Sequence, residues 1–466
     1  MKINKSKINV AKRKKDKCLY KVAIEKRVEQ IFKKENITFK PSEYNRLVMN
    51  SREKAIASIN HRDTGKIPID IGGTGVTGVH VRSVENLRRY YGLEQKPVKV
   101  TEPYQMLGDV DDELADMIGT DIIGLLSPKN MFGISQVEDW KEFRTFWGQT
   151  VLVPENFNTS LAADGSLLIY PEGDTSVPAS AKMPVSGYFF DAITRQEPID
   201  ENNLNVEDNL EEFGPITEDD LEYWKNQFNR VRNSGKAVIA NFGGTAIGDI
   251  ALVPGLNLKH PKGIREVAEW YMSTAMRPDY IHQIFDKQTD LAIRNLKRIY
   301  ENGGDAVDVL FICGTDFGTQ VSTFCSGETF EELYAPYYRK MNDWIHENTN
   351  WKTFKHSCGA IEPFISRFIN CGIDILNPVQ ISASGMDPEH LKEKYGGEIV
   401  FWGGGVDTQK VLAFGSPEEV RDQVLRNCDI FGKGGGFVFN TVHNIQANVP
   451  VENIVSMINA LKEFNG

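Results

Sequence analysis

The sequence predicts an α/β protein built on a (β/α)8 TIM barrel, with an inserted antiparallel hairpin and a basic, helical N-terminal extension. Three observations predict this fold. Short apolar segments bounded by Gly, Pro, Asn or Asp recur along the 466 residues, as strands do. Segments with helical periodicity separate most of them. With 41% hydrophobic residues, the chain has enough apolar side chains to fill one large core.

The chain divides by charge, and we expect an extension over residues 1–44 followed by a barrel domain over 45–466. Residues 1–34 carry thirteen Lys and Arg against three acids, so the net charge of −11 leaves −21 for the rest. Nucleic acid is therefore not an expected partner of the barrel. The extension either docks on an acidic partner or is a solvated, partly helical tail, because its charge run lacks apolar periodicity.

The barrel domain begins with a helix, and eight strands follow. The stretch YNRLVMNSREKAIASINHRD reads as an amphipathic helix that ends before a turn at 65–68. The expected strands are short, apolar and bounded by turn residues: 66–72, 120–126, 237–242, 307–313, 353–357, 373–378, 399–404 and 436–440. Eight such strands alternating with helices indicate a parallel barrel rather than a sandwich.

Residues 141–220 interrupt the alternation, and we expect them to form an insertion. Within 141–190, TFWGQTVLVP and GSLLIYPEGDT are joined by Asp164-Gly165, which predicts an antiparallel hairpin. Residues 200–220 then carry nine acids and no base, as in an exposed loop. A helix around TEDDLEYWKNQF returns the chain to the barrel.

The sequence lacks the features of a membrane or secreted protein. No apolar run approaches the roughly 18 residues of a membrane span, and no N-terminal segment resembles a secretory signal. Six cysteines are spread over the chain without the spacing of a disulfide framework. We therefore expect a cytoplasmic protein with reduced thiols and no membrane partner. In such a protein, a cysteine close to a histidine points to metal binding or catalysis.

Polar side chains follow several predicted strands, where barrel enzymes carry their reactive groups. Because these loops meet at one end of a barrel, we expect their side chains to gather there. Those expected to contact a substrate are His80, Gln320, Asn377, Gln380, Asp407 and Gln446. Those expected to carry the chemistry are Asp316, His356, Cys358 and His443.

His356 and Cys358 lie two residues apart at the end of a strand, so both side chains can point to the same side. Zinc takes about four ligands from Cys, His and carboxylate, and a catalytic zinc keeps one position open. His443, after the strand that closes the barrel, is the third ligand we expect. Asp316 is either a fourth ligand or a general acid beside the metal. The alternative is that His356 and Cys358 only end a strand and that Asp316 caps a turn.

Other conspicuous residues have simpler explanations. His80 follows a glycine-rich loop, where backbone groups can satisfy its ring. Three cysteines fall in apolar strand or helix patterns, as core residues do: Cys313, Cys371 and Cys428. The loop GGTGVTG (72–78) has neither the Lys-Ser/Thr end of a phosphate loop nor the glycine order of a dinucleotide site. Its glycines more simply let the backbone turn over the barrel mouth.

Three C-terminal segments resemble the uroporphyrinogen decarboxylase superfamily: FKHSCGAIEPFISRFINCGIDILNPVQ, IVFWGGGVDTQKVLAFGSPEEV and GGGFVFNTVHNIQANVPVENI. The resemblance extends over roughly residues 45–466 and implies a (β/α)8 barrel. The superfamily contains porphyrinogen decarboxylases and zinc-dependent methyltransferases that work with corrinoid proteins. The decarboxylases hold substrate carboxylates with an arginine-rich loop after the first strand, whereas this chain has no arginine there before Arg82. The methyltransferases carry an H-x-C pair, matched by His356 and Cys358, and a later cysteine, where this chain has His443.

The resemblance implies a zinc-dependent methyltransferase that moves a methyl group between a small molecule, as in O-demethylation, and a corrinoid (cobalamin) on a partner protein. Histidine in place of the later cysteine leaves about +1 on the zinc site, which suits polarising an oxygen. Asp316 would supply or take a proton. Two alternatives remain. One is a decarboxylase of a carboxylated, tetrapyrrole-like substrate clamped by Arg82, Arg88 or Arg89, and the other is a barrel that only binds a small molecule.

Overall fold

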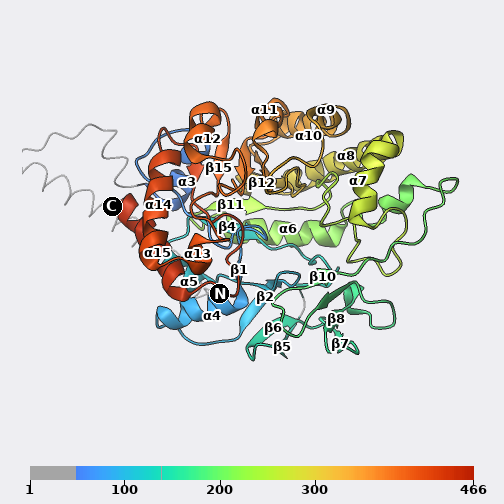
Figure 1. The fold of residues 1–466 in the computed structure, drawn as a ribbon, viewed down its shortest axis with the longest axis horizontal. Coiled ribbons are helices and arrows are strands. Elements are labelled where there is room, and N and C mark those ends of the chain that lie inside the picture. The colour runs from blue at the N-terminus through green and yellow to red at the C-terminus, as the bar shows by residue number, and fades with distance from the viewer. Residues whose placement is uncertain (1–48, 138) are drawn as a thin grey trace, which may run out of the picture. The chain divides into compact units, whose positions relative to one another are not determined.

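The computed structural model describes residues 49–137 and 139–466 (Figure 1). Contacts group residues 50–466 into one compact unit. The extension predicted over 1–44 lies outside the described residues, as does the start of the first predicted helix. Of that helix the structure contains α3 (Ser51–Ile59). It begins after Asn50, whose side chain accepts a hydrogen bond from the backbone N–H of Glu53.

Seven parallel strands form the central sheet, in the order β16-β15-β14-β13-β12-β11-β4. Their bounds are β4 (Ile122–Leu125), β11 (Ala237–Ala240), β12 (Val309–Cys313), β13 (Lys352–His356), β14 (Ile375–Asn377), β15 (Val400–Trp402) and β16 (Phe437–Val438). Neighbours pair in parallel, as Phe354 does with Ile375. Seven of the eight expected strands are therefore confirmed, in a curled parallel sheet of the kind found in barrels.

The first expected strand, 66–72, is not a regular strand. Pro68 has no N–H to donate, and the side-chain carboxylate of Asp121 takes the N–H of Ile69 at 2.8 Å. Within this segment only Ile69 forms a bridge, to Phe439 next to β16. The backbone N–H of Asp121, next to β4, donates to the carbonyl of Ile69. The segment therefore links the two edges of the sheet through a few hydrogen bonds rather than a regular ladder.

Two further sheets contain the inserted residues, in the orders β1-β3-β2-β6-β5 and β10-β9-β8-β7. Their bounds are β1 (Val79–His80), β2 (Val98–Glu102), β3 (Leu107–Gly108), β5 (Trp140–Arg144), β6 (Thr150–Pro154), β7 (Thr159–Leu161), β8 (Leu167–Ile169), β9 (Ala181–Met183) and β10 (Asp191–Ala192). The antiparallel insertion is confirmed, but the pairing predicted within it is wrong. Gly148 (φ 81°) makes a tight turn that pairs β6 with β5, and Asp164-Gly165 joins β7 to β8.

Helices cover the outside of the parallel sheet, and Figure 1 shows α8 to α12 on one side of it and β5 to β8 on the other. Their bounds are α4 (Val81–Tyr90), α5 (Asp112–Ile118), α6 (Glu218–Val231), α7 (Val267–Met276), α8 (Pro278–Glu301), α9 (Gly327–Leu333), α10 (Ala335–Asn348), α11 (Glu362–Asn370), α12 (Pro388–Tyr395), α13 (Val411–Phe414), α14 (Pro417–Phe431) and α15 (Val451–Asn465). Many begin at a capping side chain, as α14 does at Ser416 and α6 at Thr217. Helix α6 confirms the helix expected after the insertion.

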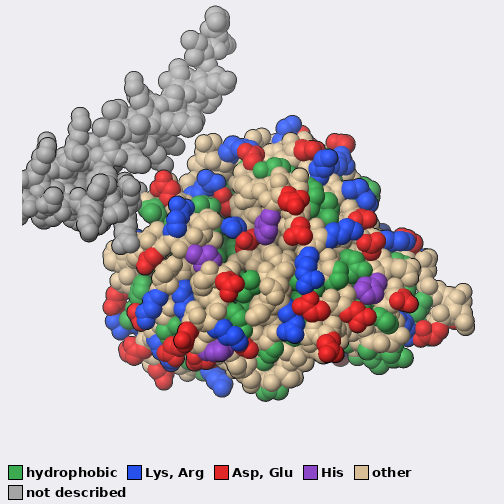
Figure 2. All heavy atoms as spheres, turned by 90° about the horizontal axis from the view of Figure 1, so that it is seen from above, with side chains coloured by type: hydrophobic (Ala, Val, Ile, Leu, Met, Phe, Trp, Pro, Cys, Tyr) green, Lys and Arg blue, Asp and Glu red, His purple; other side chains and the backbone are tan. Residues whose placement is uncertain are grey.

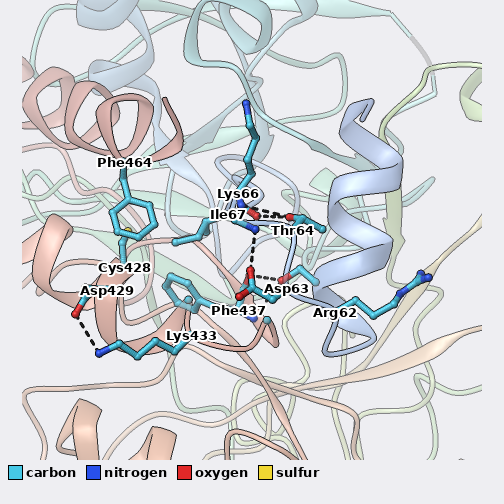
Figure 3. Close-up of a pocket in the computed structure, with 14 residues that line it drawn as sticks. Arg62, Asp63, Thr64, Lys66, Ile67, Cys428, Asp429, Lys433, Phe437 and Phe464 are labelled. Atoms are coloured by element: carbon cyan, nitrogen blue, oxygen red, sulfur yellow. Dashed lines mark hydrogen bonds and ion pairs between the residues drawn. The ribbon is translucent and has the colours of Figure 1, made fainter. Parts of the chain in front are cut away.

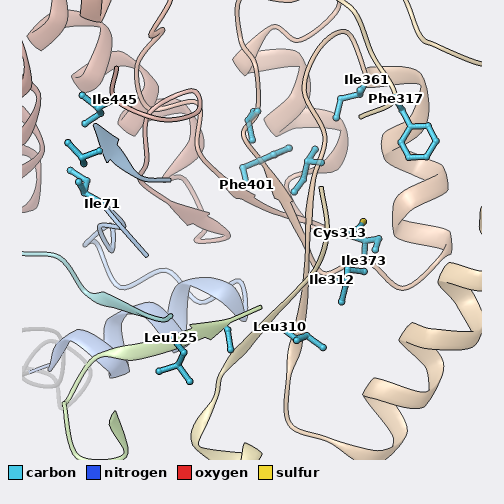
Figure 4. Packing of buried hydrophobic residues seen from close by; sticks show 14 of the residues in the cluster. Ile71, Leu125, Leu310, Ile312, Cys313, Phe317, Ile361, Ile373, Phe401 and Ile445 are labelled. Carbon is cyan, nitrogen blue, oxygen red and sulfur yellow. The ribbon is translucent and has the colours of Figure 1, made fainter. Parts of the chain in front are cut away.

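The strands present alternate residues to two cores. The first core lies within the curled sheet, where residues such as Phe311, Phe354 and Trp402 pack with Ala55 and Ile59 of α3. The second lies between the sheet and its helices and includes Leu310, Ile312, Cys313 and Phe401 (Figure 4). A barrel strand buried on both sides reads as continuously apolar, which explains why these strands stand out in the sequence.

Helix α3 closes the N-terminal end of the sheet. Its Arg52 binds the carboxylate of Asp308, just before β12, through two hydrogen bonds of 2.6 and 3.1 Å. Its Lys54 pairs with Asp121, just before β4, at 2.6 Å. The carboxyl ends of the strands, where barrel enzymes carry their sites, lie at the opposite end.

The surface carries both signs of charge. Acidic and basic side chains are interspersed over the face seen in Figure 2. The acid-rich stretch 200–220 is held to the rest of the protein by ion pairs, such as Glu212 with Arg265 and Glu201 with Arg277. Over residues 49–137 and 139–466, no helix is long and apolar enough to cross a membrane.

The Asp308 carboxylate is expected to be a main anchor of α3. It is 3% exposed and also accepts the backbone N–H of Val238 at 2.9 Å. Asp308→Ala leaves that N–H and Arg52 without a partner, so the free energy of unfolding should fall by about 2–3 kcal/mol. Urea denaturation measures the change. Glu463→Ala, which removes an exposed pair with Arg421, is the control and should leave the free energy of unfolding almost unchanged. Equal losses in both variants would contradict the anchoring role.

Candidate metal centre

His356, Cys358 and His443 converge at the carboxyl end of the sheet. His356 is the last residue of β13, Cys358 follows it by two, and His443 lies in the loop after β16. One donor atom of each lies within 4.8 Å of the others. The Cys358 Sγ atom is 3.3 Å from the Nε2 atom of His356, and the two imidazole rings are 5.1 Å apart. The structure therefore brings together the three side chains expected to bind metal.

The hydrogen bonds of His356 direct the lone pair of its Nε2 atom at the thiol of Cys358. Its Nδ1 atom lies 2.5 Å from the Oδ1 atom of Asn377, an oxygen that can only accept, so Nδ1 carries the proton. The Nδ2 group of Asn377 donates to the carbonyl of Trp402 at 2.8 Å, which fixes the orientation of the amide. The lone pair of Nε2 then faces Cys358. Metal-binding histidines are commonly oriented by such a second hydrogen bond.

His443 is held differently. Its backbone has φ 70°, a left-handed conformation that costs a non-glycine residue roughly 1 kcal/mol or more. Its Nδ1 atom accepts the backbone N–H of Asn444 at 2.8 Å, so the ring proton lies on Nε2. A metal ion bound to either nitrogen would replace this hydrogen bond. When His443 binds a metal ion, its ring therefore gives up the hydrogen bond from the backbone N–H of Asn444.

These residues fit a zinc ion in donor type and spacing. Two imidazoles and one thiol are ligands that zinc accepts, with a fourth position left for a substrate. Donor atoms bound to one zinc ion lie roughly 3–4 Å apart. The donor atoms of His356 and Cys358 already have this separation. All three donor atoms lie within 4.8 Å of one another, so His443 needs to move only slightly to join them on one ion.

Asp316 lies beside the cluster and is absent from the group of donors that could share one ion. Its Oδ1 atom accepts the backbone N–H of Cys358 at 2.6 Å. Burial raises the pKa of Asp316, against the opposing effect of that hydrogen bond. This geometry favours a proton carrier next to the metal over a fourth ligand.

The residues expected to contact substrate lie in different places. Asn377 supports His356, and Gln380 accepts the backbone N–H of Gly359 at 2.8 Å, so both brace the cluster. Asp407 accepts the N–H of Gln409 at the start of its own loop. Gln320 is exposed, and Gln446 is half-buried.

His80 has a structural role. Its Nδ1 atom caps α4 by accepting the N–H of Arg82, and its Nε2 atom bonds the carbonyl of Tyr188 at 3.1 Å. Both ring nitrogens are thus engaged by the backbone, as one interpretation of the sequence anticipated. Burial lowers the pKa of His80 to about 4, so the ring is neutral at pH 7.

Two residues near the cluster were not expected from the sequence. Asp249 accepts the N–H of Gly314 at 3.1 Å, and burial raises its pKa to about 6, with a smaller contribution from the charge of Asp316. It follows the third predicted strand, so the rule applied to other strand ends could have found it. Lys355 is fully buried, donates to the carbonyl of Thr315 at 2.9 Å and lies 4.8 Å from the ring of Phe317. Its burial could not be read from the sequence.

A separate cavity of about 280 Å³ lies among residues that precede the strands (Figure 3). Ile67, Phe437 and Phe464 supply its apolar wall, and Lys433 on its edge pairs with Asp429. None of the residues that line it belongs to the metal cluster. Ser58 of α3 and Arg62 just after it also line the cavity, so it lies at the end of the sheet that α3 closes.

The fold and the cluster define a barrel-like protein with a candidate metal centre at the carboxyl ends of its strands. Residues 257–464 match the family model of uroporphyrinogen decarboxylase (URO-D), so the C-terminal part of the chain is similar to that family. The uroporphyrinogen decarboxylase of Ruthia magnifica subsp. Calyptogena magnifica is 25% identical over 197 residues, which are 40% of this chain and 50% of that protein. That of Psychromonas ingrahamii is 31% identical over 80 residues, 17% of this chain and 22% of that protein. The chain thus spans half or less of the curated relatives it matches.

A solved structure resembles nearly the whole chain. The "methyltransferase from Methanosarcina mazei" aligns with a TM-score of 0.51 and 14% identity, over 90% of this chain and 100% of that one. At this identity the likeness shows the fold alone. The arrangement of this chain's own side chains therefore has to distinguish one activity from another.

Metal affinity is expected to rise with pH because Cys358 must lose its proton to bind. Burial and the charge of Asp316 raise the pKa of its thiol, whereas burial lowers the pKa of His356 to about 4 and that of His443 to about 3. Only the thiol should therefore release a proton near neutral pH. Between about pH 6 and 8, the logarithm of the zinc association constant should increase by about one per pH unit. Competition with a chelating dye measures this slope.

The control for this measurement is Cys371→Ala, which removes a buried thiol elsewhere in the core and should leave the slope unchanged. Cys358→Ala should bind zinc weakly and lose the slope. A slope near zero in the unaltered protein would show that Cys358 does not bind as a thiolate.

Proposed function

We propose that this chain is a zinc-dependent methyltransferase that moves a methyl group between a small molecule and a corrinoid carried by a partner protein. The observation that carries the proposal is the convergence of His356, Cys358 and His443 at the open end of the sheet, with Asp316 beside them. Two neutral imidazoles and one thiol, with His356 buried and Cys358 and His443 half-buried, form a set of donors that zinc accepts. An open end and a free fourth position are what a catalytic zinc requires.

Zinc, when bound there, supplies a Lewis acid of about +1 net charge that polarises the heteroatom carrying the methyl group. Asn377 keeps the Nε2 atom of His356 aimed at the centre, and Gln380 holds the loop that carries Cys358. Asp316 is placed to hold a proton and give it to the heteroatom that departs. Its raised pKa favours the protonated form needed for this role.

Exposed apolar side chains near Asp316 support a macromolecular partner. Tyr271 of α7 stacks on Phe324 of the loop that follows β12, with ring centroids 4.9 Å apart. Nearby on the same helix and loop, Met272, Met276 and Val321 are 48%, 68% and 75% exposed. Apolar groups grouped on a surface in this way are typical of contact sites for other proteins. A corrinoid-binding domain seated here would reach the open end of the sheet.

The decarboxylase alternative has less support. Of its candidate clamps, Arg88 is buried and bound to Asp111 and Glu113, and Arg89 is exposed and pairs with Glu85 on its own helix. Arg82 donates to the hydroxyl of Tyr188. Since all three are on α4 with protein partners, they do not form a ready site for substrate carboxylates.

The zinc-loaded protein is expected to form methylcobalamin from cob(I)alamin and a panel of O-methyl and N-methyl compounds, followed by absorbance. His356→Ala and Cys358→Ala should lower the rate at least about 100-fold, because each removes a ligand of the Lewis acid. Asp316→Asn should retain zinc and lose about 100- to 10,000-fold in rate, as expected for a lost proton donor. Glu463→Ala, which changes an exposed residue of α15 with no expected role in binding or catalysis, is the control and should react as the unaltered protein does.

Two outcomes would contradict this proposal. Release of carbon dioxide from a carboxylated porphyrinogen without metal would favour the decarboxylase. Absence of zinc, of methyl transfer and of decarboxylation, together with a small molecule that purifies with the protein, would favour a binding barrel.

A further inference from the structure

The glycine-rich loop 72–78 packs across the end of β4. A side chain cannot be placed at Gly124 of that strand, because its Cβ atom would lie 1.9 Å from the carbonyl oxygen of Gly73. The loop is also tied to itself, since the N–H of Gly72 donates to the carbonyl of Thr77 at 2.7 Å. The loop is therefore a fixed part of the barrel mouth.

Asp70 anchors the first half of this loop to the interior of the sheet. One of its carboxylate oxygens accepts the N–H of Gly73 at 2.9 Å, and the other accepts the indole N–H of Trp402 at 2.8 Å. Trp402 is completely buried in the inner core. The loop is therefore tied to a fully buried residue of the core within the sheet.

Asn444 anchors the second half and uses its whole side chain to do so. Its Oδ1 atom accepts the N–H of Gly78 at 2.6 Å. Its Nδ2 group donates to the carbonyl of Gly75 at 2.9 Å and to the Oε1 atom of Gln105 at 2.8 Å. The amide of Asn444 thus accepts one hydrogen bond and donates two, and these three bonds fix its orientation.

The residue before Asn444 is His443, which has the left-handed backbone described above. Its Nδ1 atom accepts the N–H of Asn444, and the next residue, Ile445, bonds backbone to backbone with Gly78 and His80. The strained turn that presents His443 to His356 is thus clamped on its C-terminal side by the glycine-rich loop. Without that clamp, the turn could relax to an ordinary conformation and carry the ring away.

We infer that Asn444 is the positioning residue for His443, and that the glycine-rich loop 72–78 is the brace through which it acts. The loop then serves the metal centre rather than a phosphate or a substrate. This inference rests on the proposed function only in taking His443 as a ligand, because the brace itself is a property of the protein without metal.

The test compares Asn444→Ala with Asn453→Ala. Asn453, on α15, is a matched control because it is buried to a similar degree. Its amide also donates to two backbone carbonyls, those of Leu412 and Gly415. Both variants should lose thermal stability to a similar degree. Only Asn444→Ala should bind Zn2+ at least about 10-fold more weakly in competition with a chelating dye. Its Co2+ complex should show the changed visible absorption of His443→Ala, whereas Asn453→Ala should give the spectrum of the unaltered protein.

A second measurement needs no metal. In protein labelled with 15N in its histidine rings, the His443 signals should report a proton on Nε2 in the unaltered protein and in Asn453→Ala. Asn444→Ala should give the shifts of a ring that exchanges between both neutral forms.

Equal loss of metal affinity in both variants, or an unchanged Co2+ spectrum and unchanged His443 signals in Asn444→Ala, would overturn the inference. If the unaltered protein binds neither Zn2+ nor Co2+, the proposed function fails, and the ring signals alone decide whether the brace exists.

Discussion

The alternation of side chains along β13 is the constraint on which the site depends. His356 faces the interior of the curled sheet, where Asn377, on the neighbouring strand, meets its ring. Lys355 faces the helices on the other side, among the rings of Phe317 and Phe368. A shift of one residue in the pairing of this strand would exchange the two and put an ammonium group where an imidazole now stands. The register is held because the packing of both cores depends on it.

Local patterns in the sequence were enough to predict most of the parallel sheet. The strands are short, apolar and bounded by turn residues, and these properties do not depend on distant parts of the chain. The segment 66–72 has the same composition, yet its ladder is interrupted by the carboxylate of Asp121, about fifty residues away. The pairing inside the insertion was likewise decided by a tight turn at Gly148 that the composition of TFWGQTVLVP did not reveal.

The candidate site could be predicted in its ligands but not in its supports. His356 and Cys358 share a strand end, and His443 follows the last strand, so the topology of a barrel was sufficient to bring them together. The role of Asn444 depends on contacts with Gly75 and Gly78, which lie more than three hundred residues earlier. No pattern in one sequence specifies such contacts. The similarity to decarboxylase sequences and to a methyltransferase structure does not identify these supporting contacts either, because it concerns the fold rather than individual side chains.

The burial of Lys355 has a consequence for the motions of the protein. Over the described residues, no carboxylate pairs with its ammonium group, which instead donates to the carbonyl of Thr315 and to the Sγ atom of Cys313. Water would solvate that charge better than these partners do, so hydration favours any fluctuation that lifts α10 and α11 from the back of β13. The backbone amides of α10 and α11 should therefore exchange their hydrogens faster than the dense aromatic packing around them would indicate. Directly behind His356, the strand thus carries a fully buried ammonium group that water can reach only when these helices move.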